Sequence, residues 1–421
     1  MPPGSSTGLP RCRGGIYQLL ARWQSPFSPF AMKLLRQIKT LVQQRWPLLL
    51  VALGLLLTLW SLLGDRQPDN ATTSASGNGV LEILTWEGYP PRPLVEAFVE
   101  ATSINVELGV LADTEQFAVA LNEPERRRYD LVALPLEQVR SLLAETPLLQ
   151  PIERDRLAAA TFLPPLAEIA ADYSTLDGEV YALPNVWGTT GLIANRAALD
   201  AAVTSYQDLC APANRDRVSY RPALPSLAAA AYGLGLEPFE FAAANPDDTA
   251  GWEQILSQAY DYLAACDENV HAYWRDRNEQ VQLMLSEAVT LAEGWDWTAW
   301  TLQRQNPDIE YVVPSEGLLG WLDVFAIPAD GDNLDAAYAW LDFVMQPEIA
   351  ALVLQETGTM PAVSADPEQL EEEFQPLLTE IYGEVDLSTT HWLPPRSPAL
   401  QVITDQYIEQ LNALAARSPA S

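Results

Sequence analysis

Positive charge is scarce in this sequence. Its 421 residues hold 24 Lys and Arg against 56 Asp and Glu, a formal net charge of −32. The basic residues crowd towards the N-terminus, and no lysine follows Lys39. Such an acidic body repels phosphate backbones and anionic lipid headgroups, so no nucleic-acid binding is expected. We expect most of the surface acids to serve solubility.

Histidine and the common catalytic motifs are also nearly absent. The two histidines, His271 and His391, lie far apart in the chain, which excludes a histidine metal cluster or an H-E-x-x-H motif. The sequence has no G-x-S-x-G, G-x-x-x-x-G-K-[ST] or G-x-G-x-x-G motif. We therefore predict no catalytic residue, metal or cofactor, and no enzyme.

Long hydrophobic runs are limited to residues 47–63, which carry no charge and follow Lys39 and Arg45. A basic stretch before an apolar run is typical of a secretory signal or a short membrane anchor. Asp65 stands where a lipoprotein signal would have cysteine, and no A-x-A lies close behind the run. These features favour an uncleaved anchor with its basic side in the cytoplasm and its body in the periplasm.

The apolar run also sets the first domain boundaries. Residues 1–64 form a leader, in which residues 1–31 look irregular and Met32 is the more usual start of a signal. Residues 65–79 are small and polar and predict a flexible linker.

Cysteine occurs only three times. Cys12 lies in the leader, whereas Cys210 and Cys266 lie in the exported body, where oxidation is possible. A disulfide between these two and a pair of buried free thiols remain alternatives, because the sequence does not place partners.

Short apolar runs alternate with amphipathic segments after the linker. Residues 80–86, 104–110 and 129–135 read as strands, and residues 93–102 and 136–145 as helices. This rhythm predicts a parallel sheet covered on both faces. Such sheets bind ligands at the carboxyl ends of their strands, where the segment TWEGYPPR at 85–92 lies.

Aromatic and acidic residues gather at several of these strand ends. The clusters are Trp86, Glu87 and Tyr89; Trp187 and Thr189; Glu293, Trp295, Asp296 and Trp297; and Glu316, Trp321 and Asp323. Trp and Tyr faces hold alkyl chains and cations, and a nearby carboxylate pairs with an ammonium group. Each cluster alone reads as core aromatics with surface acids, but their repetition at strand ends indicates a ligand cleft.

The order of these stretches resembles the spermidine/putrescine-binding family, the periplasmic solute-binding proteins of ABC importers. The resemblance covers most of residues 80–365. Its most specific parts are VWGTTG at 186–191 and the later stretch that runs SEG, W-x-D, IP within residues 315–328.

The resemblance implies an α/β periplasmic-binding-protein fold of type II, with two lobes, a hinge of crossing strands and a cleft between the lobes. The strands would cross near 187–189 and 295–297, and the lobes would close over a small ligand without chemistry. Residues 80–188 and 297–343 would form the first lobe, and residues 189–296 and 344–421 the second.

Carried over position by position, the resemblance assigns roles to single residues. Trp86 and Tyr89 match the aromatic lip of the first lobe, Trp187 the hinge-strand tryptophan and Trp295 the second-lobe aromatic. Trp321 and Asp323 match the W-x-D motif, although Trp321 also fits a core residue beneath the site.

Two departures from the family pattern bear on the ligand. Pro135 and Glu137 stand where the family commonly has a serine and an aromatic. The turn at 219–226, SYRPALPS, lacks the usual carboxylates and presents Arg221. An arginine near a cleft prefers carboxylate or phosphate partners, although a salt bridge to a surface acid is the alternative.

We therefore expect an exported, monomeric solute-binding protein of an ABC importer, whose partners are a small solute and a membrane permease–ATPase complex. The solute would be polyamine-like or zwitterionic, held by Glu87, Glu293, Asp296 or Asp323 between tryptophan walls. Two alternatives remain open: a glycan-active hydrolase with a Trp-lined cleft, and a sensor subunit that does not feed a transporter.

Overall fold

The computed structural model describes residues 79–86, 88–111, 116–122, 128–143, 147–158, 162–374 and 385–417. The leader, the expected anchor, nearly all of the expected linker and Glu87 lie outside the described residues. The described residues belong to one compact unit, Ser76–Ser421.

The first elements follow the expected alternation closely. They are β1 (Val80–Trp86), α2 (Arg92–Thr102), β2 (Asn105–Leu111), α3 (Gln116–Asn122), β3 (Leu131–Pro135), α4 (Leu136–Leu143), β4 (Leu149–Gln150), α5 (Pro164–Ser174), β5 (Thr175–Leu176) and β6 (Glu179–Val180). Helix α2 starts after Pro91 and ends at Ser103, whose φ of 60° breaks the helix. Its Leu94 and Phe98 are fully buried, which gives the helix one apolar face.

The rest of the chain completes a single large sheet and its covering helices. These elements are β7 (Ala182–Asn195), β8 (Val218–Tyr220), α6 (Leu224–Gly233), α7 (Pro238–Ala244), α8 (Thr249–Ala265), β9 (Val270–Tyr273), α9 (Arg277–Leu285), β10 (Leu291–Trp295), α10 (Asp296–Gln303), β11 (Ile309–Val312), β12 (Leu319–Pro328), α11 (Leu334–Val344), α12 (Pro347–Thr357), β13 (Met360–Pro361), β14 (His391–Trp392) and α13 (Pro398–Ala415).

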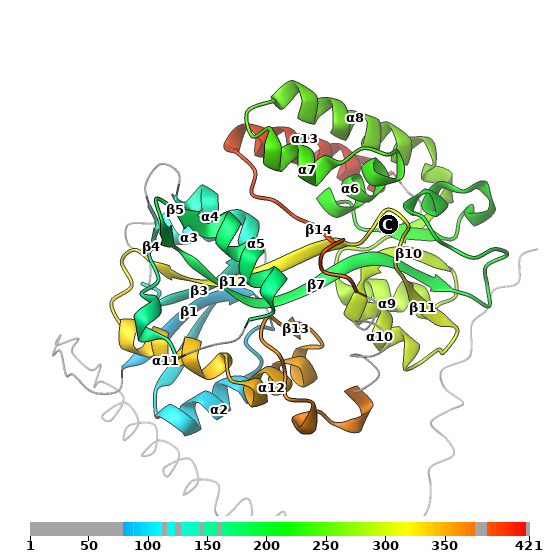
Figure 1. Ribbon diagram of the computed structural model, residues 1–421. Helices are drawn as coiled ribbons and strands as arrows, with labels where there is room; N and C mark the ends of the chain where they lie inside the picture. The colour runs from blue at the N-terminus through cyan, green and yellow to red at the C-terminus, as the bar shows by residue number, and fades with distance from the viewer. Residues whose placement is uncertain are drawn as a thin grey trace, which may run out of the picture. The chain divides into compact units, whose positions relative to one another are not determined.

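Two long strands connect two groups of parallel strands. The order is β2-β1-β3-β12-β7-β10-β8-β9, in which β1 pairs in parallel with β2 and β3, and β8 pairs in parallel with β9 and β10. Strands β7 and β12 lie between the groups and pair antiparallel with each other. Figure 1 shows both as long arrows that run from one group into the other. We call the β1–β3 side the first lobe and the β8–β10 side the second lobe.

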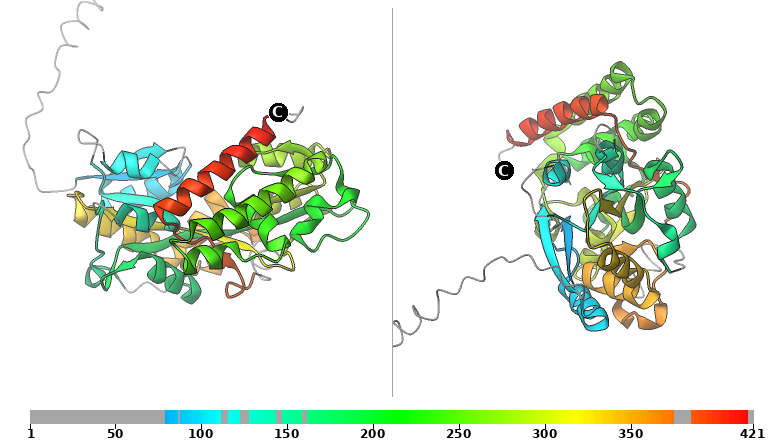
Figure 2. Two further views of the ribbon diagram at one scale, coloured as in Figure 1. Left: turned by 90° about the horizontal axis from the view of Figure 1, so that it is seen from above. Right: turned by 90° about the vertical axis from the view of Figure 1, so that its left-hand side faces the viewer.

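Each lobe has its own hydrophobic core. In the first lobe, Leu81 and Phe98 pack with Trp340 and Val353. In the second, the α6 alanines pack with Trp252 of α8, against which α13 also lies (Figure 2). Most of the apolar packing lies within one lobe or the other, and the long strands β7 and β12 run through both.

Two parts of the chain lie in a different lobe from the one that the sequence predicted. Strand β11 pairs with residues 192–195 of β7, and α10 packs Ala299 and Leu302 onto the same core, so both belong to the second lobe. Helix α12 packs against α2 in the first lobe. Apolar periodicity shows that these segments are buried but not against which sheet they pack.

Two further features concern the cysteines and the apolar helices. A disulfide bond joins Cys210 to Cys266. Within the described residues, no single helix is long and apolar enough to cross a membrane; α11 and α12 pass that test only as a pair, bent by 81°.

Candidate functional site

Two adjoining cavities lie where the lobes meet. The larger has a volume of about 580 Å³ and is lined by Trp86, Pro135, Glu137, Thr190, Arg221, Pro225, Trp295, Trp297, Trp321, Asp323 and Leu393. The smaller, of about 370 Å³, is lined by Gly88, Tyr89, Val186, Arg277, Trp297, Trp321, Asp323, Glu356, Thr357 and Thr359. Because three lining residues are shared, the two cavities form one cleft with two chambers. Lining residues come from both lobes.

The topology explains why these residues meet. Trp86 ends β1, Pro135 ends β3 and Trp295 ends β10, so the carboxyl ends of strands from both lobes face the cleft. Trp321 and Asp323 stand on the crossing strand β12, opposite Gly188 and Val186 of β7. A side chain at Gly188 would overlap the Trp321 ring, so glycine lets the indole lie against the β7 backbone.

Aromatic rings form the walls of the cleft and are held by other rings. The Trp86 ring meets Phe117 edge to face at 4.7 Å, and the Trp295 ring meets Trp274 in the same way at 4.9 Å. The guanidinium of Arg277 stacks on Trp297 at 3.4 Å from the ring centroid. Such contacts fix the ring positions before a ligand arrives.

Two half-buried carboxyls of the first lobe face the larger chamber. Burial and, to a smaller extent, the charge of Glu137 raise the pKa of Asp323 from 3.8 to about 7, against the opposite effect of the neighbouring Trp86 indole. Burial also raises the pKa of Glu137, against the effect of the Arg396 charge. Among the described residues, neither carboxyl makes an ion pair. Two such acids create a site that favours a cation.

Arg221 faces the same chamber from the second lobe. It follows β8 and precedes α6, and its guanidinium lies 5.2 Å from the ring centroid of Trp295 and 5.6 Å from that of Trp274. Burial lowers the pKa of Arg221, and the charge of Glu293 raises it. Glu293 is buried behind Arg221, where it accepts hydrogen bonds from the Arg221 backbone N–H at 3.3 Å and from Ser226 Oγ at 3.1 Å.

Sequence comparison shows the family of this chain. Residues 94–375 match the family of bacterial extracellular solute-binding proteins. The chain belongs to this family. It is therefore an extracytoplasmic solute-binding protein rather than an enzyme, and the expected glycan-hydrolase alternative is not supported.

Individual relatives agree with this assignment. The chain is 25% identical over 360 residues to the spermidine/putrescine-binding periplasmic protein 1 of Haemophilus influenzae, covering 83% of this chain and 93% of that protein. It is 26% identical over 295 residues to the spermidine/putrescine-binding periplasmic protein of Escherichia coli, covering 68% of this chain and 78% of that protein.

A solved structure shows the same fold. The spermidine/putrescine ABC transporter substrate-binding protein PotD from Streptococcus pneumoniae superimposes with a TM-score of 0.65 at 21% identity, over 80% of this chain and 99% of that one. The fold of this solute-binding protein is the type II periplasmic-binding-protein fold, as the sequence predicted.

Six of the residues expected to bind the solute line the larger chamber of this solute-binding protein, namely Trp86, Arg221, Trp295, Trp297, Trp321 and Asp323. Tyr89 lines the smaller chamber, and its hydroxyl donates a hydrogen bond to Asn185 Oδ1 at 2.7 Å. Burial raises the Tyr89 pKa well above its ordinary value. Glu87 lies outside the described residues.

Four of the expected residues lie behind the cleft wall. Asp296 is fully buried and accepts hydrogen bonds from the Thr189 backbone N–H at 2.6 Å and the Thr189 hydroxyl at 2.9 Å, which ties α10 to β7. Trp187 is buried and donates from Nε1 to the Pro361 carbonyl at 3.2 Å. Glu293, the fourth, supports Arg221. Strand ends carry both lining and supporting residues, and the sequence does not separate them.

Other lining residues were not expected. Arg277 and Glu356 lie in α9 and α12, and Thr190 follows Thr189 on β7 with its side chain towards the cleft. Alternation along a strand could have indicated Thr190, since neighbouring strand residues point to opposite faces. Glu137 stood out only as a departure from the family pattern.

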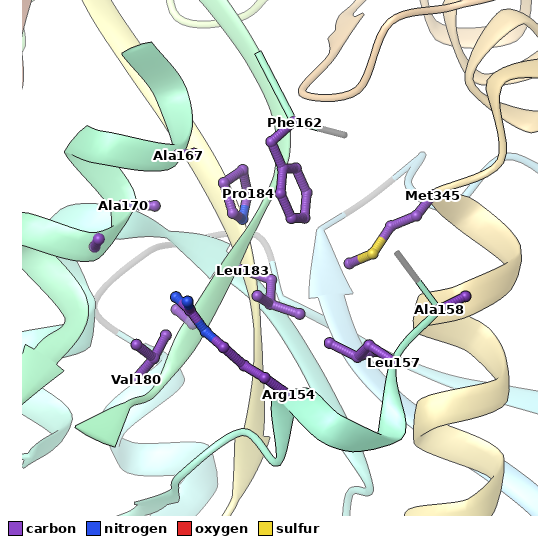
Figure 3. Close-up of a pocket in the computed structure, with 12 residues that line it drawn as sticks. Arg154, Leu157, Ala158, Phe162, Ala167, Ala170, Val180, Leu183, Pro184 and Met345 are labelled. Atoms are coloured by element: carbon purple, nitrogen blue, oxygen red, sulfur yellow. The ribbon is translucent and has the colours of Figure 1, made fainter. Parts of the chain in front are cut away.

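A separate cavity of about 250 Å³ lies in the first lobe (Figure 3) and is lined by other residues than those named for the cleft. Phe162, Leu183 and Met345 line it with several alanines, and Arg154 lies along one side. Of the described residues that line it, one is charged and none belongs to the second lobe. Among the described residues, no group of acids, histidines and cysteines could hold a metal ion.

Proposed function

We propose that this protein is the solute-binding component of an ABC importer and captures a small amine-bearing solute in the cleft between its lobes. The observation that carries this proposal is the pair of carboxyls, Asp323 and Glu137, without an ion pair among the described residues and set between Trp86 and Trp321. The relatives named for spermidine and putrescine support an amine as the ligand.

An ammonium group fits this site for electrostatic reasons. Half-buried carboxylates without a cation lose hydration energy, which the raised pKa values of Asp323 and Glu137 reflect. An incoming ammonium restores an ion pair and charge-assisted hydrogen bonds. The faces of Trp86, Trp297 and Trp321 then contact the alkyl part of the solute and its cationic end.

We further propose that the lobes close over the solute. The cleft is lined from both lobes, and β7 and β12 connect them as a hinge. A solute that contacts both walls binds the closed arrangement more tightly than the open one and so shifts the population towards it. The closed form would dock on a permease–ATPase complex, with the N-terminal segment holding the protein at the membrane.

Replacing Asp323 tests the proposed amine site. The probes are putrescine, cadaverine, γ-aminobutyrate and δ-aminovalerate, which all carry a terminal ammonium, with affinity measured by calorimetry. In Asp323→Asn, we expect the best of the four to bind roughly ten- to a hundredfold more weakly, because the charged partner is lost. Asp261→Asn, an exposed aspartate of α8, is the matched control and should leave affinity unchanged.

Thermal unfolding of the same variant separates lost binding from misfolding. Because the folded-state pKa of Asp323 is raised from 3.8 to about 7, the empty protein loses stability as the pH rises from 3.8 to about 7, and the full loss is present above that range. Asp323→Asn should therefore unfold at a higher temperature than the wild type at about pH 8. Failure of all four amines to bind the wild type would refute the proposed function.

A further inference from the structure

In the described part of the chain, the guanidinium of Arg221 makes no hydrogen bond and no ion pair. The hydrogen bonds of this residue use its backbone: the N–H donates to Glu293 and the carbonyl accepts from Ser226. Among the residues that the structure describes, no ion pair involves its side chain. Arg221 lines the larger chamber, so its in-plane N–H donors are presented to the cavity rather than to the protein.

The surroundings of Arg221 keep it in this position. Trp274 and Trp295 contact the guanidinium through their ring faces, which attract its charge but cannot accept its in-plane N–H groups in the way a carboxylate does. Glu293 is buried behind it, does not line the cavity and already accepts two hydrogen bonds. Glu293 therefore compensates the charge of Arg221 without accepting hydrogen bonds from the guanidinium N–H groups.

Helix α6 adds to the positive potential of this wall. It begins at Leu224, three residues after Arg221, and its next residue, Pro225, lines the chamber. The first turn contains no acidic residue, and no side chain of the described residues caps its N-terminus. The partial positive charge of a helix N-terminus thus acts in the same direction as Arg221.

From this arrangement we infer that the solute is a zwitterion, whose carboxylate pairs with Arg221 while its ammonium lies at Asp323 and Glu137. This inference rests on the proposed function, since it needs an amine in the cleft. The forked guanidinium matches a carboxylate with two parallel hydrogen bonds. A single arginine suits the single charge of a carboxylate better than the double charge of a phosphate.

The same geometry disfavours a diamine. The second ammonium of a diamine that fills the chamber would lie beside Arg221, where like charges repel and neither is hydrated. A zwitterion instead places each charge against its opposite on a different lobe. It therefore bridges the two lobes and favours their closure more than a diamine does.

Matched ligand pairs test this inference. Calorimetry on the exported body measures the affinity for each ligand of two pairs. The first pair is γ-aminobutyrate and putrescine, and the second is δ-aminovalerate and cadaverine. Within each pair, the amino acid has a carboxylate where the diamine has its second amine. The wild type should prefer the amino acid of at least one pair by roughly ten- to a hundredfold. Arg221→Gln should abolish this preference, and Arg221→Lys should restore part of it, because lysine keeps the charge but not the fork.

Arg215→Gln is the control, because Arg215 lies in the same lobe and pairs on the surface with Glu268. It should leave the preference unchanged. If diamines bind as tightly as the amino acids, or if the preference persists in Arg221→Gln, the zwitterion inference is wrong while the proposed amine site stands. If neither series binds the wild type, both fail.

Discussion

At the scale of single residues, the ionisation of Asp323 couples solute binding to pH. Its pKa is raised from 3.8 to about 7 by burial and then by the Glu137 charge, so a large fraction is protonated in mildly acidic solution. A protonated carboxyl no longer pairs with an ammonium. We therefore expect the affinity for the best-binding amine to fall below about pH 7, approaching tenfold for each further pH unit.

Calorimetry from about pH 5 to about pH 8 measures this dependence. In Asp323→Asn the affinity is already low. The change of affinity with pH over this range should also be much smaller than in the wild type, because the titrating carboxyl is gone. Glu137 lines the same chamber and also titrates. Comparing Asp323→Asn with the double variant Asp323→Asn/Glu137→Gln shows how much Glu137 contributes to the pH dependence of the affinity. A wild-type affinity that stays constant across the range would contradict an ammonium partner at Asp323.

The residues of the site also show which of its parts could be predicted from the sequence. Trp86, Trp295 and Trp321 could be predicted because large aromatics at strand ends of an open α/β sheet face the ligand edge. Asp296 could not be placed correctly, since a carboxylate that accepts hydrogen bonds from a distant strand of the same protein and one that binds a ligand look alike in sequence. Glu356 could not be found, because its helix reaches the cleft only through the tertiary fold.

At the scale of elements, β14 connects to helices of both lobes. His391 of β14 shares a small cavity with Asp172 and Tyr173 of α5 and with Glu240 of α7. Its Nδ1 lies 2.6 Å from Glu240 Oε1, and its Nε2 lies 2.7 Å from the Glu316 carbonyl oxygen. Both partners are acceptors, so the doubly protonated imidazolium satisfies both contacts.

His391 is expected to stabilise the fold in a pH-dependent way. Burial alone would lower its pKa, but the hydrogen bonds to Glu240 and Glu316 raise it above 6.5. A raised histidine pKa contributes stability below its ordinary value, and this stability is lost as the pH rises through the folded-state value. His391→Gln should therefore lower the unfolding temperature by several degrees at about pH 6 and by much less at about pH 9.

His271→Gln serves as the comparison for this prediction. Its partner Asp216 is 74% exposed, and such a surface pair contributes little. The variant should lie close to the wild type at both pH values. Equal loss of unfolding temperature at both values in His391→Gln would show that His391 packs without contributing its charge.

Elements were predictable where one face is clearly apolar. Strand β1 and helix α2 end within a few residues of the ranges expected from periodicity and proline positions. The lobe to which α12 belongs was not predictable, because its small buried residues Ala350 and Ala351 fit either sheet equally well. Its position follows from packing on α2, which is a long-range contact.

At the scale of the whole molecule, a contact between Trp297 and Gly358 joins the lobes beside the cleft. Trp297 of the second lobe has Arg277 on one ring face, and its indole lies against Gly358 at the end of α12 in the first lobe. Trp297 also borders both chambers. Lobe closure, as proposed, would form or keep this contact, so a change at Gly358 should alter the balance between open and closed forms.

Gly358→Ala tests this role of the contact. The glycine has a φ of 73°, so alanine costs about 1 kcal/mol of backbone strain, and its methyl group would also overlap the Trp297 ring. Gly235 ends the turn after α6 with a φ of 76°, and an added methyl group meets nothing there. Gly235→Ala therefore has the same strain without the inter-lobe clash.

Both variants should lose similar stability from strain, but only Gly358→Ala should also bind the best amine more weakly. Displacing the Trp297 indole disfavours the closed form. The apparent affinity for the amine then falls in proportion to the fraction of molecules that can adopt the closed form. Calorimetry gives the affinities, and small-angle X-ray scattering with and without solute gives the compaction on binding. Equal affinities in the two variants would show that the contact between Trp297 and Gly358 does not contribute to closure.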